Sequence, residues 1–369
     1  MSERTSDLDT PSLLFDLDAL EANLAEMAEV ARLAGVRLRP HTKTHKSPDI
    51  AWMQVQAGAA GITVAKLGEA EVMVDAGLDD VLVAYPIWGV AKLARLRALM
   101  ERASIRVSLD SVEVAEGIGR IGRDLGRDVP VLVEVDTGLH RLGRAPGLPS
   151  IELATSVARV AGVDVIGLLT HAGHAYASPD AGALRATAER EAMDLLETAE
   201  GCARAGLEIQ EISVGSTPTA RIAAAVPGVT EIRPGTYAVN DVQQMRLGVA
   251  TEATCAARVL VTVVARPTAE RFVVDAGTKA LTSDGPTGEG SSFPGRGVVS
   301  GRPDLHLDFM SEEHGVGHIQ DGGSLEIGDR LEVIPLHACG CINQFDLAYG
   351  ARRGVVERAF PIVARGRMR

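Results

Sequence analysis

The chain has 369 residues, of which 46% are hydrophobic, 23% charged and only 3% aromatic, a composition that excludes a disordered or fibrous protein. Its length is sufficient for two domains, or for one large barrel with an appended domain. The 49 acidic residues outnumber the 37 lysines and arginines, and the resulting net charge of −12 argues against nucleic acid as a partner and favours a small molecule. No apolar run is long enough to cross a membrane and the N-terminus is polar, so we expect a cytoplasmic protein without a membrane partner.

The first predicted element is a helix. Asp18 and Glu21 are placed to cap its start, and Gly35 is placed to end it. Its apolar face is expected to consist of Leu20, Leu24, Met27 and Ala31.

Helical patterns then alternate with short β-branched runs as far as about residue 240. The expected strands are residues 36–39, 61–65, 81–85, 105–109, 131–135, 163–170, 209–214 and 230–233. Eight parallel strands in about 200 residues indicate an α/β fold, a (β/α)8 TIM-type barrel over residues 16–240. An open doubly wound sheet is the alternative, but the first strand is followed by no glycine-rich dinucleotide motif.

The pattern becomes rich in β structure after residue 240. Strands are expected at residues 257–265, 271–274 and 330–335, with a long turn-rich segment at residues 283–301. We therefore predict a second, mostly β domain over residues 241–369, to which residues 1–15 contribute a strand at residues 11–15.

Chemistry in such a barrel is expected after the strands, at their C-terminal ends. The first strand is followed by His-Thr-Lys-Thr-His-Lys, which contains Lys43 and Lys46. A solvated basic loop is the simpler interpretation of this string. A lysine in a barrel mouth must be paired or desolvated, however, and a lysine that binds an aldehyde cofactor needs the lowered pKa that results.

Other strand ends place polar residues at the same mouth. The end of the fifth strand places Glu134, Asp136, His140 and Arg141 there, and the end of the sixth places His171, His174 and Tyr176. The seventh strand is followed by Gly215, Ser216 and Thr217, and the eighth ends in the run of residues 233–237. Gly, Ser and Thr turns after the seventh and eighth strands are typical of phosphate sites in barrels. Together these features predict a phosphate-bearing cofactor with its aldehyde facing a lysine on the first strand.

Three motifs carry a family resemblance. Residues 39–46 (RPHTKTHK), 136–143 (DTGLHRLG) and 233–237 (RPGTY) resemble motifs of the fold-type III pyridoxal-phosphate enzymes, in the D-threonine aldolase and D-serine dehydratase branch of the alanine racemase superfamily. The resemblance covers essentially the whole chain. It implies a homodimer with the active site at the subunit interface and a D-amino acid as the substrate.

The resemblance also implies roles for individual residues. Lys43 would bind pyridoxal 5'-phosphate covalently, whereas Lys46 would be structural. Arg141 would pair with the phenolate oxygen of the cofactor, His171 would stack on its ring, and Arg233 would lie near the ring nitrogen. The phosphate would be held by Gly215, Ser216, Thr217, Gly235, Thr236 and Tyr237.

His337 and Cys339 form a second signature near the C-terminus. A lone His-x-Cys in a strand is usually a packing feature, but in the family that this chain resembles the equivalent pair binds a divalent cation beside the cofactor. On the expected strand, the spacing of two residues would direct both side chains to one face. The thiolate favours zinc over manganese or magnesium, and Cys341 is expected to take no part.

These features predict a lyase that acts on D-3-hydroxy amino acids. A metal ion on the β-hydroxyl would promote either retro-aldol cleavage, as in a D-threonine aldolase, or loss of hydroxide, as in a D-serine dehydratase. The resemblance favours the aldolase. The dehydratase is the alternative, because the His-x-Cys pair is typical of that side of the family, and His174 and Tyr176 are the candidate acid or base groups in either case. A racemase would need a tyrosine base such as Tyr349, and a cofactor-carrier protein would lack the β domain.

Overall fold

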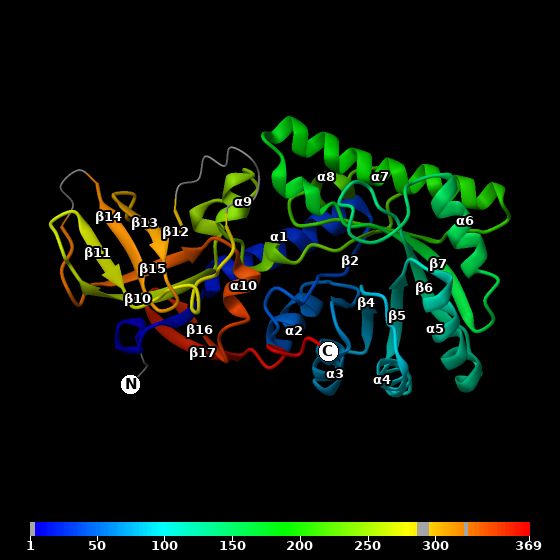
Figure 1. Cartoon of the computed structure of the whole chain (residues 1–369), viewed down its shortest axis with the longest axis horizontal. Coiled ribbons are helices and arrows are strands. Elements are labelled where there is room, and N and C mark those ends of the chain that lie inside the picture. Colours follow the sequence, from blue (N-terminus) through cyan, green and yellow to red (C-terminus); the bar gives the residue numbers. More distant parts are fainter. Residues whose placement is uncertain (1–3, 286–294, 321–323) are drawn as a thin grey trace. The chain divides into compact units, whose positions relative to one another are not determined.

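The computed structural model of the chain describes residues 4–285, 295–320 and 324–369 (Figure 1). The chain divides into two compact units, each with its own sheet. We call them the α/β unit, formed by Glu26–Lys43, Ala51–Gly235 and Gly366–Arg369, and the β unit, formed by Met1–Ala25, Thr44–Ile50 and Thr236–Arg365.

A parallel sheet is the centre of the α/β unit. Its eight strands, all in the described part of the chain, follow the order β2-β9-β8-β7-β6-β5-β4-β3. They are β2 (Arg37–Leu38), β3 (Ile62–Val64), β4 (Asp80–Val83), β5 (Ser104–Leu109), β6 (Val129–Glu134), β7 (Val163–Leu169), β8 (Glu211–Val214) and β9 (Glu231–Ile232). The two end strands meet through a parallel bridge between His41 and Thr63, so the sheet closes on itself. The predicted barrel and its eight strands are confirmed.

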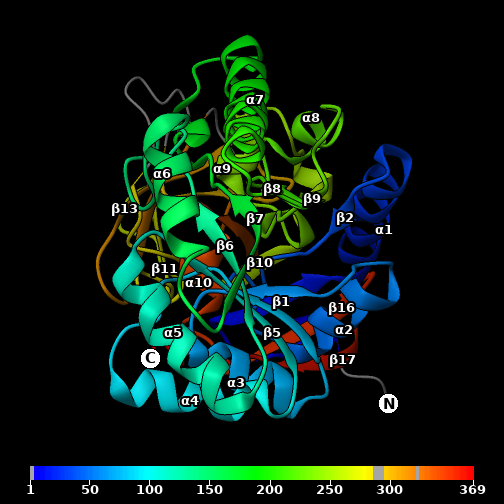
Figure 2. The ribbon, with the colours of Figure 1, turned by 90° about the vertical axis from the view of Figure 1, so that its right-hand side faces the viewer.

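Helices cover the outer side of these strands, as Figure 2 shows for α3 to α7. The helices up to residue 224 are α1 (Leu17–Ala34), α2 (Pro48–Gln56), α3 (Leu67–Asp75), α4 (Val90–Met100), α5 (Val112–Leu125), α6 (Leu148–Val157), α7 (Ala181–Arg204) and α8 (Ala220–Ala224). Within the described residues, none is both long and apolar enough to cross a membrane.

Helix α1 has the apolar face that the sequence predicts, but its predicted cap is wrong. The four residues expected on its apolar face are all buried, and Gly35 follows its last residue with a positive φ of 69°. The cap is Asp16, whose carboxylate accepts a hydrogen bond from the Ala19 amide at 3.2 Å. Asp18 already lies inside the helix, and both Asp18 and Glu21 bind the Arg352 guanidinium instead.

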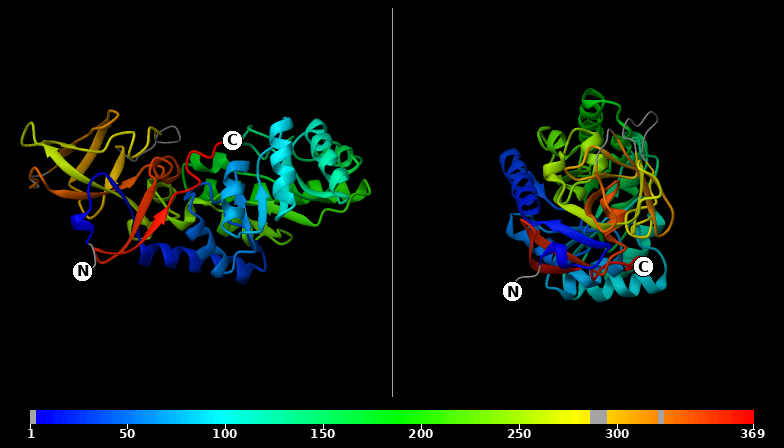
Figure 3. Two further views of the ribbon diagram at one scale, coloured as in Figure 1. Left: turned by 90° about the horizontal axis from the view of Figure 1, so that it is seen from below. Right: turned by 90° about the vertical axis from the view of Figure 1, so that its left-hand side faces the viewer.

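The β unit contains a nine-stranded sheet in its described residues, with the order β11-β14-β13-β12-β15-β10-β1-β16-β17. Figure 3 shows the strands of this unit, most of them yellow to red, from two further directions. The strands are β1 (Ser12–Asp16), β10 (Ala257–Ala265), β11 (Arg271–Val274), β12 (Gly297–Val299), β13 (Leu305–Met310), β14 (Gly315–Ile319), β15 (Arg330–Pro335), β16 (Leu347–Arg352) and β17 (Val355–Pro361). Strand β11 also pairs with β10, which closes six of the strands into a barrel. Strand β1 pairs with β10 and β16, so the N-terminal segment does contribute a strand.

The shorter helices are α9 (Val242–Arg246), α10 (Ala338–Ile342) and the 3-10 turns η1 (Thr5–Asp7), η2 (Gly173–Ala177), η3 (Thr236–Ala238) and η4 (Glu252–Thr254). The expected turn-rich segment at residues 283–301 lies partly outside the described residues. Its described end forms β12, so the prediction of a continuous loop is wrong there. Pairing with β15 and β13 makes this short run a strand.

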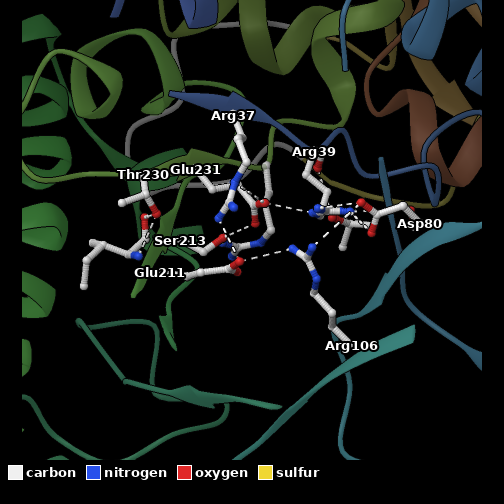
Figure 4. A network of polar contacts seen from close by, with 11 residues as sticks. Arg37, Arg39, Asp80, Arg106, Glu211, Ser213, Thr230 and Glu231 are labelled. Carbon is white, nitrogen blue, oxygen red and sulfur yellow. Dashed lines mark hydrogen bonds and ion pairs between the residues drawn. The ribbon is translucent and has the colours of Figure 1, made fainter. Parts of the chain in front are cut away.

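A network of ion pairs between side chains lies among the strands of the parallel sheet, as Figure 4 shows. The Arg39 guanidinium donates to Glu231 and to Asp80, each at 2.8 Å, and Arg39 and Glu231 are almost completely buried. Burial alone would raise the pKa of Glu231, but the charge of Arg39 and a hydrogen bond from Ser213 lower it overall. Arg37 and Arg106 pair with Glu211 at 2.9 and 3.3 Å in the same network.

We expect Arg39→Ala to lower the free energy of unfolding by about 3–5 kcal/mol, because it removes the buried cation that donates to the Glu231 carboxylate and leaves the more distant Arg37, at 3.7 Å, as its ion-pair partner. Denaturant unfolding followed by circular dichroism measures this change. Arg32→Ala is the matched control, since Arg32 makes a two-point pair with Glu29 on the exposed surface of α1 and its loss should change stability far less. Equal stability of the two variants would contradict the prediction.

Candidate active site

Lys43 lies in the turn that follows the first strand of the barrel. The Thr42 amide donates to the Thr63 carbonyl at 2.9 Å, which continues the parallel contact made by His41. Lys43 is the next residue and is half-buried, and its amide donates to Nδ1 of His41 at 3.4 Å. The barrel therefore places Lys43 at the C-terminal end of a strand that extends past β2.

Positive charge gathers around two imidazoles at this end of the sheet. Burial lowers the pKa of His41 well below its usual value, and the charges of Lys43 and Arg233 lower it further. Burial also lowers the pKa of His171, followed by the charges of Lys43 and Arg141. Both rings are therefore neutral near pH 7, and the three cations act on one small region. Such a region attracts an anion.

A hydrogen bond joins the segments that follow β7 and β8. Nδ1 of His171 lies 3.2 Å from the carbonyl oxygen of Gly215. Because a carbonyl can only accept, Nδ1 carries the proton of the neutral ring and Nε2 keeps its lone pair. The orientation of His171 thus depends on the position of the Gly215 turn.

The turn after β8 is buried and tied to the segment after β9. Gly215 has a φ of 112°, a conformation that favours glycine. The Ser216 amide donates to the Thr219 hydroxyl at 3.1 Å, and the Gly235 amide donates to the Thr217 hydroxyl at 3.2 Å. Four of the six predicted phosphate-binding residues therefore lie together.

The other two predicted phosphate-binding residues lie in the β unit. Thr236 and Tyr237 belong to η3, and both are buried. The Asn240 amide donates to the Thr236 carbonyl at 2.7 Å, which holds this turn. The Thr236 hydroxyl lies 3.9 Å from Sγ of Cys339.

Arg141 lies in a loop after β6 that is shaped by two carboxylates. Asp136 accepts hydrogen bonds from the amides of Gly138 and His140 at 3.0 and 2.9 Å. Burial would raise the pKa of Asp136, but these amides and the His140 ring lower it overall. Glu134 lies 3.7 Å from the Arg141 guanidinium, and burial raises the pKa of Glu134 even so. The loop therefore holds Arg141 beside a buried carboxyl group.

Arg233 is buried, and its guanidinium is held by neutral groups. It donates to the Ser213 hydroxyl at 2.6 Å and to the Thr170 carbonyl. Ser213 in turn donates to Glu231 at 2.6 Å, so a continuous chain of hydrogen bonds runs from Arg39 through Glu231 and Ser213 to Arg233. The ion network in Figure 4 thereby fixes the orientation of Arg233.

His174 and Tyr176 lie in η2, which follows β7, and both are half-buried. A β-carbon at Gly138 would lie 3.2 Å from the His174 ring, so the ring rests on the backbone of the loop that carries Arg141. Nδ1 of His174 is buried and has no hydrogen-bond partner among the described residues. Burial lowers the pKa of His174, which is therefore neutral near pH 7 and able to accept a proton.

The predicted metal pair lies in the β unit, but not on a strand. Strand β15 ends at Pro335, and His337 is the residue that begins helix α10, with Cys339 in its first turn. The expectation that a strand directs both side chains to one face is therefore wrong. The chain turns here because the Asp241 carboxylate accepts the Ala338 amide at 3.0 Å and so caps the helix.

Imidazole, thiol and carboxylate groups nevertheless meet at this helix start. Nδ1 of His337 bonds to the Asp284 carboxylate, and Sγ of Cys339 donates to the Thr44 hydroxyl at 3.3 Å. Burial would lower the pKa of His337, but hydrogen bonds to Cys339 and Asp284 and the charges of Cys339 and Asp241 raise it to about 10. The surroundings of this imidazole therefore favour positive charge.

The residues fit a divalent ion with open coordination positions. An imidazole and a thiol are the ligands that zinc prefers, and a carboxylate on the second ring nitrogen of a histidine is the usual support for a metal ligand. Within the described ranges, His, Cys, Asp and Glu side chains form no cluster of three arranged to hold a metal ion.

The other cysteines are buried thiols. Sγ of Cys341 donates to the Ala280 carbonyl at 3.2 Å. Burial raises the pKa of Cys255 to about 12 and also raises that of Cys202. These three residues have the properties of core side chains.

Four residues that lie near the predicted cofactor-binding residues or near the predicted metal pair were not predicted from the sequence. His41 could have been found, because it stands two positions before Lys43 in the same motif. Asp241 and Asp284 contact the metal pair only through tertiary structure. Glu191 is completely buried beside Gly215, yet it belongs to a long helix with many charged residues, and its position in the sequence gives no signal.

Comparison with known proteins gives matches along the chain. Residues 15–241 match the family model of the alanine racemase N-terminal domain, and residues 256–351 match a putative serine dehydratase domain. The chain is 36% identical to D-threo-3-hydroxyaspartate dehydratase of Delftia sp. (strain HT23), over 94% of each chain. It is 33% identical to D-threonine aldolase of Arthrobacter sp, over 97% of this chain and 93% of that one.

Solved structures agree with these matches. The crystal structure of D-threonine aldolase from Filomicrobium marinum has a TM-score of 0.93 and 32% identity, and the match covers 100% of this chain and 98% of that one. The Delftia dehydratase has a TM-score of 0.88 and 34% identity, over 97% of this chain and 98% of that one. Its solved variants include a histidine-to-alanine variant and a metal-free form of a variant in which the cysteine two positions further along is alanine.

The chain therefore belongs to the D-threonine aldolase and D-serine dehydratase family of pyridoxal-phosphate-dependent lyases, a branch of the alanine racemase superfamily.

Proposed function

We propose that the protein uses pyridoxal phosphate and a divalent metal ion to cleave D-3-hydroxy amino acids, with D-threonine as the type of substrate and glycine and an aldehyde as products. The observation that carries the proposal is the gathering of Lys43, Arg141 and Arg233 around a neutral His171. The barrel of residues 16–240 would bind the cofactor, and the domain of residues 241–369 with 1–15 would carry the metal ion.

The residues of the α/β unit fit this cofactor. Bound pyridoxal phosphate supplies an electron sink that stabilises negative charge at Cα of the amino acid. Lys43 would bind its aldehyde carbon, and the buried turn at Gly215–Thr217, with Gly235, would bind its phosphate. Arg141 would bind the ring oxygen, and Arg233 would lie at the ring nitrogen.

The metal pair would act on the hydroxyl group of the substrate. A divalent ion at His337 and Cys339 supplies a Lewis acid for the β-oxygen. Asp284 holds Nδ1 of His337 and would keep its ring in place. The spacing of the pair equals that of the histidine and cysteine replaced in the Delftia dehydratase, whose cysteine variant was solved metal-free, and this supports the assignment. We propose zinc, because a thiolate selects a borderline-soft ion over manganese or magnesium.

The state of His174 favours the aldolase reaction. Cleavage of the Cα–Cβ bond begins when a base removes the proton of the β-hydroxyl, whereas in elimination the oxygen leaves as hydroxide held by a Lewis acid or, with an added proton, as water. His174 is neutral near pH 7, and its buried Nδ1 is without a partner among the described residues. We assign it the acceptance of this proton, with Tyr176 in the same 3-10 turn as the neighbouring acid or base.

A dehydratase is the second candidate. The 36% identity to D-threo-3-hydroxyaspartate dehydratase and the shared His-x-Cys spacing support it. Its products would be a 2-oxo acid and ammonia, formed from a D-3-hydroxy amino acid such as D-serine. We keep it as the alternative because the same residues would bind the cofactor and the metal ion in both reactions.

Product analysis tests the choice between the two reactions. Purified protein is incubated with D-threonine, D-serine and D-alanine, with and without a chelator. We expect glycine and acetaldehyde from D-threonine, and loss of this activity with the chelator. Pyruvate from D-serine as the main product would replace the aldolase by the dehydratase, and L-alanine from D-alanine would indicate a racemase. We expect the active species to sediment as a homodimer, and a fully active monomer would contradict that assembly.

Lys43→Ala should abolish the visible absorbance of lysine-bound cofactor and lower kcat by about 10³-fold or more, because no other group would replace the covalent bond. Lys46→Arg is the matched control. Lys46 lies three residues further along with a positive φ of 55°, and this variant should keep the absorbance. Loss of the band in Lys46→Arg together with its retention in Lys43→Ala would reverse the assignment.

Cys339→Ala should remove the metal ion and lower activity by about 10²-fold or more, while the visible spectrum of the bound cofactor remains. Metal analysis of the dialysed protein and absorbance spectroscopy measure the two effects separately. Cys341→Ala is the control, since Cys341 is buried against Ala280 and should keep the metal ion. Full metal content in Cys339→Ala would exclude this residue as a ligand.

A further inference from the structure

Glu191 is a buried carboxyl group on the inner side of helix α7. Its side chain is only 1% exposed. It faces the Thr219 hydroxyl and the amides of Ala172 and Gly215, which lie close enough to lower its pKa. Neither carboxyl oxygen makes a hydrogen bond of normal geometry within the described residues. A carboxyl group in this position is costly in its charged form.

The groups around Glu191 belong to the two turns that would hold the cofactor. Ala172 directly follows His171, whose ring donates to the Gly215 carbonyl. Thr219 accepts the amide of Ser216 in the turn after β8. Glu191 therefore lies behind the two turns and contacts the backbone that orients both the imidazole and the phosphate-binding residues.

The nearby cation does not neutralise Glu191 through a hydrogen bond. Arg233 is the positive group that acts on it, but the hydrogen bonds of that guanidinium go to Ser213 and to the Thr170 carbonyl. On α7 itself, Arg190 is paired with Asp194 at 2.6 Å. Burial raises the pKa of Glu191 to about 7, so its two forms have similar populations near neutral pH.

We propose that Glu191 is a positioning residue of the phosphate-binding turn and that it takes up a proton when a phosphate monoester binds beside Gly215. The inference rests on the proposed function, because it requires the turn at Gly215–Thr217 to hold the phosphate of the cofactor. A carboxylate behind this turn would repel the phosphate, whereas the neutral acid would not. The proton comes from solvent and forms an O–H bond on the Glu191 carboxylate, and no bond between heavy atoms changes.

The direction of the pH effect follows from this linkage. Below about pH 7 Glu191 already carries its proton, and phosphate binding costs nothing further. Above about pH 7 binding must first add the proton, so the affinity for the phosphate falls as the pH rises. A neutral glutamine in the same place would remove this dependence while keeping the shape of the side chain.

The test titrates the full-length cofactor-free protein with pyridoxal 5'-phosphate and, separately, with pyridoxal, which lacks the phosphate. Affinities are measured between about pH 6.5 and about pH 8.5 for the wild type and for Glu191→Gln. Comparing the two proteins at each pH cancels the titration of Lys43 and of the phosphate itself. Glu189→Gln is the matched control, because Glu189 lies on the same helix in an exposed pair with Arg185.

We expect Glu191→Gln to bind pyridoxal 5'-phosphate like the wild type at the low end of this range and about tenfold more tightly at the high end. The same comparison with pyridoxal should show no change with pH, and Glu189→Gln should follow the wild type throughout. A constant ratio of the two affinities for pyridoxal 5'-phosphate would overturn the inference, as would an equal pH effect with pyridoxal. Failure of the wild type to bind pyridoxal 5'-phosphate at Lys43 would instead overturn the proposed function.

Thermal unfolding of the cofactor-free proteins gives a second measurement. Because the pKa of Glu191 is raised on folding, its burial costs stability as the pH rises from its usual pKa towards about 7. The melting temperature of the wild type should therefore fall relative to that of Glu191→Gln over this range. A constant difference would show that the carboxyl group does not titrate in the folded protein and would overturn the inference.

Discussion

The parallel contact at Thr63 is the constraint on which the position of Lys43 depends. Thr63 donates its amide to the Pro40 carbonyl at 2.8 Å and its hydroxyl to the Arg39 carbonyl at 2.9 Å. Its own carbonyl accepts the Thr42 amide at 2.9 Å. Pro40 has no amide hydrogen, and it occupies a place where only its carbonyl is needed. One threonine on β3 thus closes the barrel and fixes the backbone as far as the residue before Lys43.

The buried arginines of the α/β unit differ in whether carboxylate groups neutralise their charge. In the network of Figure 4, Arg39 has carboxylate partners at hydrogen-bond distance. Arg233, at the carboxyl ends of the strands, is held by a hydroxyl and a carbonyl, so its charge is fixed in place but not neutralised there. Burial lowers the pKa of Arg233, which shows the cost of keeping this charge away from water. A bound anion would reduce that cost, and the barrel therefore favours an anionic ligand at this end.

Local patterns explain which elements could be predicted from the sequence. The barrel strands and residues 257–265, 271–274 and 330–335 are short runs that contain β-branched residues and lie between turn residues, and the structure has strands there. The lysine turn could be placed because it directly follows such a run. Tertiary contacts decide the features that were missed: β12 exists through its pairing with β15, and the helix start at His337 exists through the Asp241 carboxylate. The sequence does not single out Glu191, because its unusual property is its burial. Burial depends on tertiary contacts and not on the neighbouring residues in the sequence.

The two reactions of the family differ in what happens to the β-hydroxyl group of the substrate. Retro-aldol cleavage and elimination can share Lys43 and the metal pair, because both need a polarised β-oxygen and an electron sink at Cα. They separate at the β-oxygen, which gives up its proton in cleavage and breaks its bond to Cβ in elimination. A side chain that serves this oxygen acts as a base in cleavage and can act only as an acid in elimination. Burial against the Gly138 loop lowers the pKa of His174 and makes it a base near pH 7. In the reaction that we propose, the packing of this ring therefore keeps it able to accept the proton of the β-hydroxyl.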